Sequence, residues 1–279
     1  MKSIVFIDLD GTLWWNEVIP DSAIQAIEKA VQNGHLVFSN TGRTRFAAWP
    51  SLKGLPLNGQ VYASGAEIWL NGKCIFYNPI PAEKTKRLIQ KLSAFNIGIA
   101  TEGVNKLHGN DRCRQRFDAG LNKQIQDKDQ PEIFFEFLNM PDLSQMSEED
   151  YQEVMKLSLV DVEMGSLDQI LEEEDMIFTI FGIQDEDELM NGEITQKQFD
   201  KGRAFDTIRN ILKQDFHTIA LGDSANDISM FDAADLAIAM GNATEETKQH
   251  ADYVTASVLD DGLYQAFKYA GLLEPDQEE

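Results

Sequence analysis

Two carboxylates near the start of the chain, Asp8 and Asp10, are the residues whose types and spacing most directly suggest chemistry. They follow the apolar run Ile4–Ile7 and precede Gly11 and Thr12. Two negative charges this close repel each other unless a cation lies between them or one carboxyl keeps its proton. The pair is therefore suited to binding a metal ion or to acid–base chemistry, and an acidic surface turn is the alternative without a function.

A calcium-binding EF-hand loop that begins at Asp8 is excluded by its spacing. Such a loop needs an oxygen ligand at its fifth position, glycine at its sixth and glutamate at its twelfth. These positions hold Thr12, Leu13 and Ile19. The carboxylate pair needs another explanation.

A second group of polar residues, Thr41-Gly42-Arg43, follows the next apolar run. Thr41 offers a hydroxyl, Gly42 a backbone amide that no side chain shields, and Arg43 a guanidinium; all three groups suit a phosphate group. Lys201 stands just before an expected helix start, where a lysine is unusual because the helix dipole is positive there. Taken singly, the triplet fits an ordinary turn and Lys201 fits a surface residue.

The segment Gly222–Asp227 places carboxylate and amide groups at the end of a further apolar run. Asp223, Asn226 and Asp227 provide the oxygen ligands that a hard cation prefers, although a helix-capping turn has the same residue types. Because all these groups follow expected strands of one sheet, we predict that they form one site.

The elements that would position these groups alternate between strand and helix. A helix is predicted between Asp21 or Ser22, which can cap it, and Gly34, which can end it. The predicted strands are Ile4–Ile7, His35–Asn40, Val61–Ala63, the hairpin Glu67–Tyr77 with Asn-Gly at its turn, Thr218–Leu221 and Leu236–Met240. This alternation predicts a parallel sheet.

The character of the sequence changes between these two parts. Basic helical segments and short strand candidates mix there, among them Arg112–Lys123, Ile133–Leu138 and Ile177–Ile183. We therefore predict the α/β class, with a Rossmann-like parallel-sheet core in residues 1–81 and 192–279 and an inserted α+β domain in residues 82–191.

The amino-acid composition limits the kinds of molecule that this protein is expected to bind. The 279 residues carry a formal net charge of −23, so we expect no nucleic acid as a partner. No apolar run is long enough for a membrane span, and Cys74 and Cys113 form no metal-ligand pattern, which favours a reducing cytoplasm. A phosphorylated substrate would be repelled by the overall field, so its site needs concentrated positive charge. The oligomeric state is not determined by the sequence.

Three arginines of the inserted segment, Arg112, Arg114 and Arg116, stand out in so acidic a chain. They form a solvated face, or one of them holds the part of an anionic substrate that is not transferred. On a helix, Arg112 and Arg116 share a face while Arg114 points away.

With these motifs in place, the chain resembles the haloacid dehalogenase superfamily, and within it the Cof-like sugar-phosphate phosphatases, over nearly its whole length. The four matching motifs are D-x-D-G-T at Asp8–Thr12, T-G-R at Thr41–Arg43, Lys-Gly at Lys201-Gly202 and G-D-x-x-N-D at Gly222–Asp227. In this subfamily a cap domain is inserted between the second and third motifs, where the composition changes. One departure is Ser64-Gly65-Ala66 in place of the usual N-G-A.

The resemblance implies a Mg²⁺-dependent phosphatase that hydrolyses small phosphorylated metabolites through an aspartyl-phosphate intermediate. It implies that Asp8 is the nucleophile and that Asp10 is the acid and base. The catalytic residues implied are Asp8, Asp10, Thr41 and Lys201, the substrate-binding residues are Leu9, Gly42, Arg43 and Asn226, and the metal-binding residues are Asp8, Asp10, Asp223 and Asp227.

Other functions stay open beside this one. A phosphomutase keeps the same four motifs, and a non-catalytic, metal-dependent binding protein can use the same fold. An esterase of the G-D-S type is disfavoured because Thr247 stands where the partner of His250 would have to be aspartate. The substrate itself, whether a hexose phosphate, a nucleotide or pyridoxal phosphate, is not named by the sequence.

Overall fold

In the computed structural model, which describes residues 2–116, 140–183 and 189–274, the apolar run before Asp8 forms β1 (Ser3–Ile7). All five residues of β1 are buried. The strand lies between β2 (Leu36–Asn40) and β11 (His217–Gly222) and is parallel to both. Because β1 is paired on both edges and covered on both faces, it has no polar face, which explains its continuous apolar sequence.

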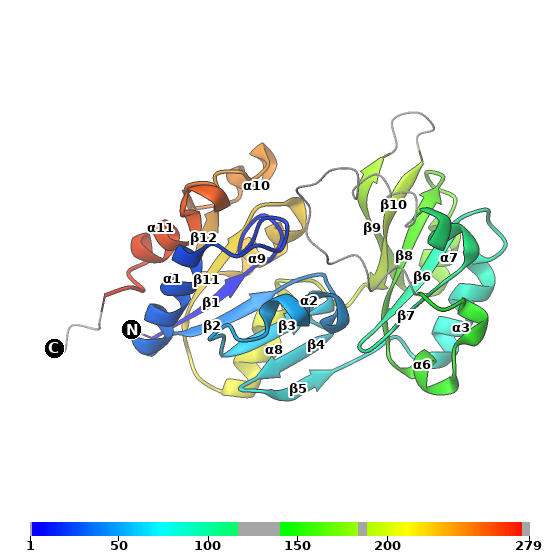
Figure 1. Ribbon diagram of the computed structural model, residues 1–279, viewed down its shortest axis with the longest axis horizontal. Helices are drawn as coiled ribbons and strands as arrows, with labels where there is room; N and C mark the ends of the chain where they lie inside the picture. The colour runs from blue at the N-terminus through cyan, green and yellow to red at the C-terminus, as the bar shows by residue number, and fades with distance from the viewer. Residues whose placement is uncertain (1, 117–139, 184–188, 275–279) are drawn as a thin grey trace. The chain divides into compact units, whose positions relative to one another are not determined.

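These strands belong to an eight-stranded sheet (Figure 1). Its order is β13 (Tyr253–Val254), β12 (Leu236–Ala239), β11, β1, β2, β3 (Gly59–Tyr62), β4 (Glu67–Leu70) and β5 (Lys73–Tyr77). The strands from β13 to β3 are parallel, and β4 and β5 continue as an antiparallel hairpin. Asn71 and Gly72 at its turn both have positive φ, as the predicted tight turn requires.

Helices cover the two faces of this sheet. One buried apolar cluster receives residues from α1 (Asp21–Gln32), α2 (Arg45–Leu52) and α11 (Gly262–Tyr269). A second cluster receives residues from α8 (Arg203–Leu212) and α9 (Ile228–Ala233). The remaining short elements here are η1 (Ala63–Gly65), η4 (Ala225–Asp227), α10 (Glu245–Gln249) and η5 (Val258–Asp260). The predicted α/β class with a parallel sheet is confirmed.

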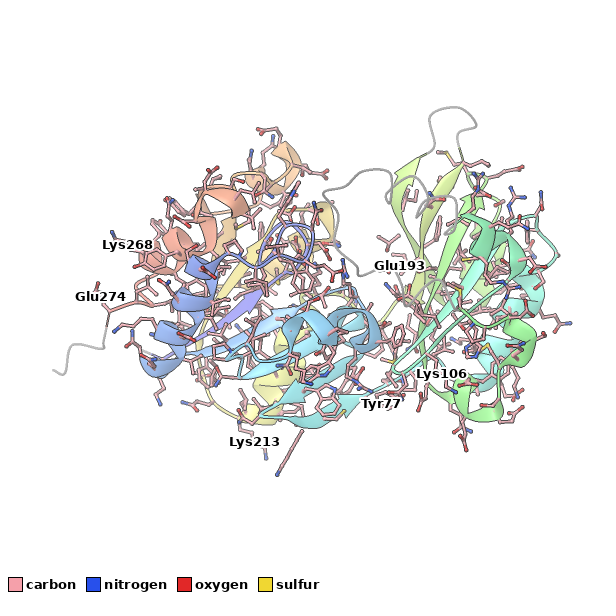
Figure 2. All side chains as sticks on the ribbon, viewed as in Figure 1. Tyr77, Lys106, Glu193, Lys213, Lys268 and Glu274 are labelled. Carbon is pink, nitrogen blue, oxygen red and sulfur yellow. The ribbon has the colours of Figure 1, made fainter. Side chains whose placement is uncertain are left out.

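The residues between Tyr77 and Phe199 form a second compact unit. Tyr77, at the end of β5, is the last residue of the first unit before the chain enters it (Figure 2). Its antiparallel sheet has the order β7 (Leu107–Gly109), β6 (Gly98–Gly103), β8 (Val154–Val162), β10 (Met190–Gln196) and β9 (Met176–Ile183). Its other elements are α3 (Ala82–Leu92), η3 (Leu143–Gln145), α6 (Glu148–Gln152), α7 (Asp168–Glu173) and a helical stretch at residues 111–116.

The boundaries of this unit differ from those predicted. It comprises Asn78–Gln198 together with Thr44–Ala47, so residues 192–198 lie in the inserted unit and not in the core. The cause is β10, which pairs with β8 and β9. Neither β8 nor β10 was predicted, because Lys156 on one and Glu193 on the other interrupt the apolar pattern and are buried as an ion pair.

Two predictions for the inserted segment fall partly or wholly outside the described residues. The predicted helix 112–123 is helical as far as residue 116, and residues 117–123 lie outside the described part. The strand predicted at 133–138 lies outside it as well. Among the helices of the described ranges, none is long and apolar enough to cross a membrane.

Candidate active site

Three neighbouring parallel strands end at the same edge of the first sheet, each with a polar residue directly after it. Asp8 follows β1, Thr41 follows β2 and Asp223 follows β11. On one side of β1 the sheet continues with β2 and β3, and on the other side it continues with β11 and β12. The order in which the chain adds strands therefore reverses at β1. Open α/β sheets bind ligands at such a point.

Lys201 lies at the centre of this edge and is 2% exposed. Its Nζ is 2.6 Å from Asp8 Oδ1, 2.6 Å from Asp227 Oδ1 and 2.9 Å from Asn226 Oδ1. Burial would lower the pKa of Lys201, but the charges of Asp227 and Asp8 outweigh it and raise the pKa above its ordinary value. The lysine is therefore a fixed cation, the local positive charge that so acidic a chain needs.

The backbone around Lys201 explains how it is held. The Asn40 side-chain amide donates to the carbonyl of Lys201 at 2.9 Å and so ties it to the end of β2. Gly202 packs directly on α9, where an added Cβ would lie 2.2 Å from the carbonyl oxygen of Ser229. Only glycine allows this approach. Asn40 was not among the predicted site residues, although it directly precedes Thr41.

Asp8, Asp223 and Asp227 form the cluster in which a metal ion can be held, with one oxygen from each within 4.8 Å of the others. Burial and the charge of Asp227 raise the pKa of Asp8 well above its ordinary value, against the influence of Lys201. Burial and Asp227 likewise raise the pKa of Asp223 to about 6. Three carboxylates that repel one another are stabilised by a divalent cation with oxygen preference, so the donor set fits Mg²⁺.

The three carboxylates are not equally available. Asp227 Oδ1 is bound to Lys201, and its Oδ2 accepts from the backbone amides of Asp223 and Ser224 at 2.9 and 3.0 Å. Among the described residues, the Asp8 carboxylate accepts only from Lys201. Asp227 therefore positions Lys201 and the loop after β11, and the oxygens open to a cation are those of Asp8 and Asp223.

Gly11 and Thr12 bring the Asp8–Thr12 motif into contact with the Gly222–Asp227 motif. The Thr12 hydroxyl donates to Asp223 Oδ1 at 3.2 Å. Gly11 has φ +81°, and an added Cβ would lie 2.4 Å from Asp223 Oδ2. The Asn242 side-chain amide donates to the Gly11 carbonyl at 2.8 Å, a support that the sequence analysis did not identify.

Asp10 faces the rim of the site and is paired with Arg43. Arg43 Nε donates to Asp10 Oδ2 at 2.8 Å and Nη2 donates to Oδ1 at 2.7 Å, while Trp14 Nε1 also donates to Oδ1 at 3.0 Å. Burial alone would raise the pKa of Asp10, but the hydrogen bonds and charge of Arg43 outweigh it and lower the pKa. Arg43, predicted to bind substrate, has Asp10 as its partner here.

The remaining predicted residues are placed as follows. Thr41 is buried, its hydroxyl oxygen accepts from the Arg43 amide at 3.1 Å, and its carbonyl accepts from the Ser64 amide at 2.9 Å. Ser64, which replaces the usual asparagine, therefore supports Thr41 through its backbone. The Leu9 side chain is fully buried in the core, so only its backbone can reach a substrate.

In the inserted unit, the three arginines have protein partners. Arg112 Nε and Arg116 Nε both donate to Asp161 Oδ2, at 2.7 and 2.9 Å, which confirms that they share a face. Arg114 pairs with Asp111 and Asp142 instead. A cavity of ≈ 200 Å³ adjoins Arg112 and Asp161. The ion pairs favour a structural role for this cluster.

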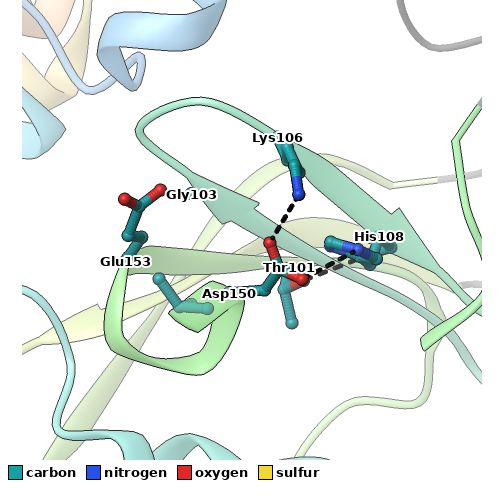
Figure 3. A pocket seen from close by; sticks show the side chains of 7 residues that line it. Thr101, Gly103, Lys106, His108, Asp150 and Glu153 are labelled. Atoms are coloured by element: carbon teal, nitrogen blue, oxygen red, sulfur yellow. Dashed lines mark hydrogen bonds and ion pairs between the residues drawn. The ribbon is translucent and has the colours of Figure 1, made fainter. Parts of the chain in front are cut away.

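A smaller pocket of the same unit lies beside the turn between β6 and β7. Figure 3 shows Lys106 and His108 directed at Asp150, with Nζ at 3.1 Å from Oδ1 and Nε2 at 3.8 Å from Oδ2. Asp150 also completes a capping box with Ser147 at the start of α6. Lys106 and His108 thus connect β7 and the turn before it to Asp150 of α6, so this pocket is a weaker candidate than the sheet edge.

Comparisons with known proteins concern the chain as a whole. The family of haloacid dehalogenase-like hydrolases matches residues 5–267. YkrA of Bacillus subtilis (strain 168), named as a candidate phosphatase, is 26% identical over 98% of this chain and 99% of its own. The 5-amino-6-(5-phospho-D-ribitylamino)uracil phosphatase YcsE of that organism is 26% identical over 95% of this chain and 94% of its own. The solved structure of the subclass IIB sugar phosphatase BT4131 has a TM-score of 0.73 and 25% identity, covering 97% of this chain and all of that one.

Proposed function

The chain belongs to the haloacid dehalogenase-like hydrolases, and from this premise we propose that it is a Mg²⁺-dependent phosphatase of small phosphorylated metabolites. The observation that carries the proposal is the buried arrangement around Asp8. A cationic Lys201 lies 2.6 Å from one oxygen of Asp8, and the Asp223 carboxylate lies within the same cluster. A carboxylate held between positive charge and a cation site is suited to attack on phosphorus.

Each side chain then has a defined task. Asp8 attacks phosphorus and forms an aspartyl phosphate, which water hydrolyses in a second step. Asp10 protonates the leaving oxygen and later accepts a proton from the attacking water. Lys201 and Thr41 hold the phosphoryl oxygens, and Asp227 and Asn226 hold Lys201 in place.

Mg²⁺ would be held by Asp8 and Asp223, together with the backbone carbonyl of Asp10. When bound, it supplies positive charge that offsets the charge developing on the phosphoryl oxygens. Asp227 was implied as a further ligand, but its oxygens already have partners, so we assign it the positioning of Lys201. The acidic field of the whole chain makes this concentrated charge necessary.

For the substrate we propose a phosphorylated sugar or polyol. The support is the naming of YcsE for a phosphoribityl compound and of BT4131 for sugar phosphates, each similar to this chain over nearly its full length. We place the reaction in the cytoplasm because the chain has two cysteines, Cys74 and Cys113, and they form no metal-ligand pattern.

The experiment that tests the function is phosphate release from a panel of phosphorylated metabolites, with Asp8→Asn as the decisive variant. The amide is nearly isosteric but a much weaker nucleophile, so we expect kcat to fall by roughly 10³-fold or more while the fold is kept. Activity should also vanish in excess chelator, return with Mg²⁺ and be inhibited by Ca²⁺, whose looser coordination misplaces the nucleophile.

Two outcomes would contradict the proposal. If Asp8→Asn kept kcat within tenfold of the wild type, the nucleophile would be another residue. If the protein rearranged phosphorylated substrates and released little free phosphate, it would be a phosphomutase.

A further inference from the structure

Glu17 is a buried carboxylate that the proposed reaction does not use. Its side chain is 8% exposed. Oε1 accepts from Arg43 Nη1 at 2.7 Å, and Oε2 accepts from the Ser51 hydroxyl at 2.8 Å. Both oxygens are therefore held, one by the loop after β2 and one by α2.

The loop that carries Glu17 is itself under constraint. Trp15 and Val18 form two backbone hydrogen bonds of 3.1 and 3.0 Å across a tight turn. Asn16 and Glu17 within it have φ of +50° and +59°, the left-handed region that residues with a Cβ rarely adopt. Such a conformation persists where the surroundings impose it, and functional sites are a common place for it.

Arg43 connects this loop to Asp10. Its Nη1 is bound to Glu17, while Nε and Nη2 are bound to the two oxygens of Asp10. Its guanidinium carbon also lies 5.4 Å from the centre of the Trp14 ring, whose Nε1 donates to Asp10. The guanidinium plane is therefore fixed from both sides, and with it the direction of the Asp10 carboxylate.

We propose that Glu17 is a positioning residue of the active site: anchored by Ser51, it fixes Arg43, and Arg43 holds Asp10 where it meets the leaving oxygen of the substrate. The inference rests on the proposed phosphatase function. In that step the bond between Asp8 oxygen and phosphorus forms, the bond from phosphorus to the leaving oxygen breaks, and its electron pair stays on that oxygen. The leaving oxygen takes the proton of Asp10, so loss of Glu17 should impair mainly substrates that need this proton.

The test compares phenyl phosphate with p-nitrophenyl phosphate, two substrates of similar shape. Phenolate is the more basic leaving group and needs protonation, whereas p-nitrophenolate leaves with little help. We expect Glu17→Gln to lower kcat/KM for phenyl phosphate about tenfold more than for p-nitrophenyl phosphate, since a positioned acid contributes at least that much. The value of kcat/KM reports the steps from substrate binding to phosphoryl transfer and does not depend on the later hydrolysis of the aspartyl phosphate.

The ratio of the two kcat/KM values does not depend on how much of the variant is folded, because the enzyme concentration cancels. Ser51→Ala, which keeps the charge of Glu17 and removes one anchor, should change the ratio in the same direction by a smaller factor. Glu28→Gln, the same substitution at an exposed position of α1, should leave the ratio unchanged. With Arg43→Ala already present, Glu17→Gln should have no further effect on the ratio, because the two residues act in series.

If Glu17→Gln lowered kcat/KM equally for both substrates, or lowered it for neither, Glu17 would be a structural ion pair and its positioning role would be overturned. A wild-type protein that hydrolyses neither substrate nor any member of the metabolite panel would instead contradict the proposed function.

Discussion

At the scale of single residues, the site depends on where a few charges are placed. Lys201 contacts the oxygens of Asp8, Asn226 and Asp227, yet it lies 193 positions from Asp8 in the sequence. Its burial removes the competition of water, so each of these contacts is stronger than it would be on the surface. Lys201 thus places one fixed positive charge directly beside Asp8 and Asp227.

Asp223→Ala tests the cation site at this scale. Asp223 and Asp8 are the carboxylates with oxygens open to a cation, so removing one should raise the Mg²⁺ concentration for half-maximal activity by about tenfold or more. The measurement is a Mg²⁺ titration of phosphate release. Asp206→Ala removes an exposed carboxylate from α8 and should leave the titration unchanged. An unaltered Mg²⁺ requirement in Asp223→Ala would remove this residue from the site.

Asp8, Thr41 and Asp223 could be recognised from the sequence because each follows a predicted strand, and Lys201 because of its unusual place before a helix. Asp8, Thr41 and Asp223 come together because parallel strands end at a common edge. Glu17, Asn40 and Asn242 support the site through loops and side-chain amides, and no periodic pattern marks such positions. The partner of Arg43 could not be predicted either, since its side chain reaches Asp10 and Glu17 across the fold.

At the scale of elements, the inserted unit is held together by charge as well as by apolar packing. Asp161, with no exposed side-chain surface, joins the helical stretch at residues 111–116 to β8 through Arg112 and Arg116. It has φ +63° and lies where the pairing of β8 with β10 shifts register. A buried carboxylate therefore fixes a helix at an irregular point of the sheet.

Asp161→Asn should destabilise this unit by about 2 kcal/mol, because two guanidinium groups lose their charged partner while remaining partly exposed. Asparagine tolerates positive φ as well as aspartate does, so the backbone is not the cause. Urea unfolding measures the change. Asp175→Asn, also at positive φ but with a side chain 79% exposed, should change the free energy of unfolding by less than about 0.5 kcal/mol. Equal stability of Asp161→Asn and the wild type would show that the arginines are merely solvated.

Elements with an uninterrupted apolar or amphipathic pattern were predicted well, and those with buried charge were not. The hairpin β4–β5 and strands β1 and β2 match their predictions within a residue. The strands β8 and β10 were missed because Lys156, Asp161 and Glu193 are buried in pairs, which composition alone does not reveal. Helix α2 was missed because Pro50 lies inside it.

At the scale of the whole molecule, the family, the α/β fold class and the phosphatase type of the enzyme could all be predicted, and the comparisons confirm them. Four short motifs, at Asp8–Thr12, Thr41–Arg43, Lys201-Gly202 and Gly222–Asp227, were sufficient for this prediction. The domain boundary was harder to predict, because β10 carries polar residues that resemble a connecting segment.

Stability of the whole protein should fall on acidification, in part through His108. Burial lowers the pKa of His108, and Lys106 lowers it further, against the influence of Asp150. The folded protein therefore binds this proton less tightly than the unfolded chain does. The contribution of His108 is fully present above the ordinary histidine value of about 6.5, and it is lost as the pH falls through the lower folded value.

The measurement is the free energy of unfolding in urea at pH 7.5 and 5.5, for the wild type and His108→Gln. Burial and Asp227 raise the pKa of Asp223 to about 6, which lies in the same range, so the informative quantity is the difference between the two proteins. The wild type should lose more stability than the variant on this change of pH. An equal loss would mean that His108 accepts its proton without cost in the folded state.

The pairing of β1 with β11 also has a consequence for how the chain acquires its fold during synthesis. Ser3 pairs with His217 and Ile7 with Leu221, so one edge of the first strand has no partner until more than two hundred further residues have been made. At a ribosomal rate of about 5–20 residues per second, this edge stays open for roughly 10–40 s. During that interval the nascent chain carries an unpaired apolar strand, a known risk for aggregation, while the inserted unit can already fold behind it. The arrival of β11 closes that edge and brings Asp223 beside Asp8 in the same event.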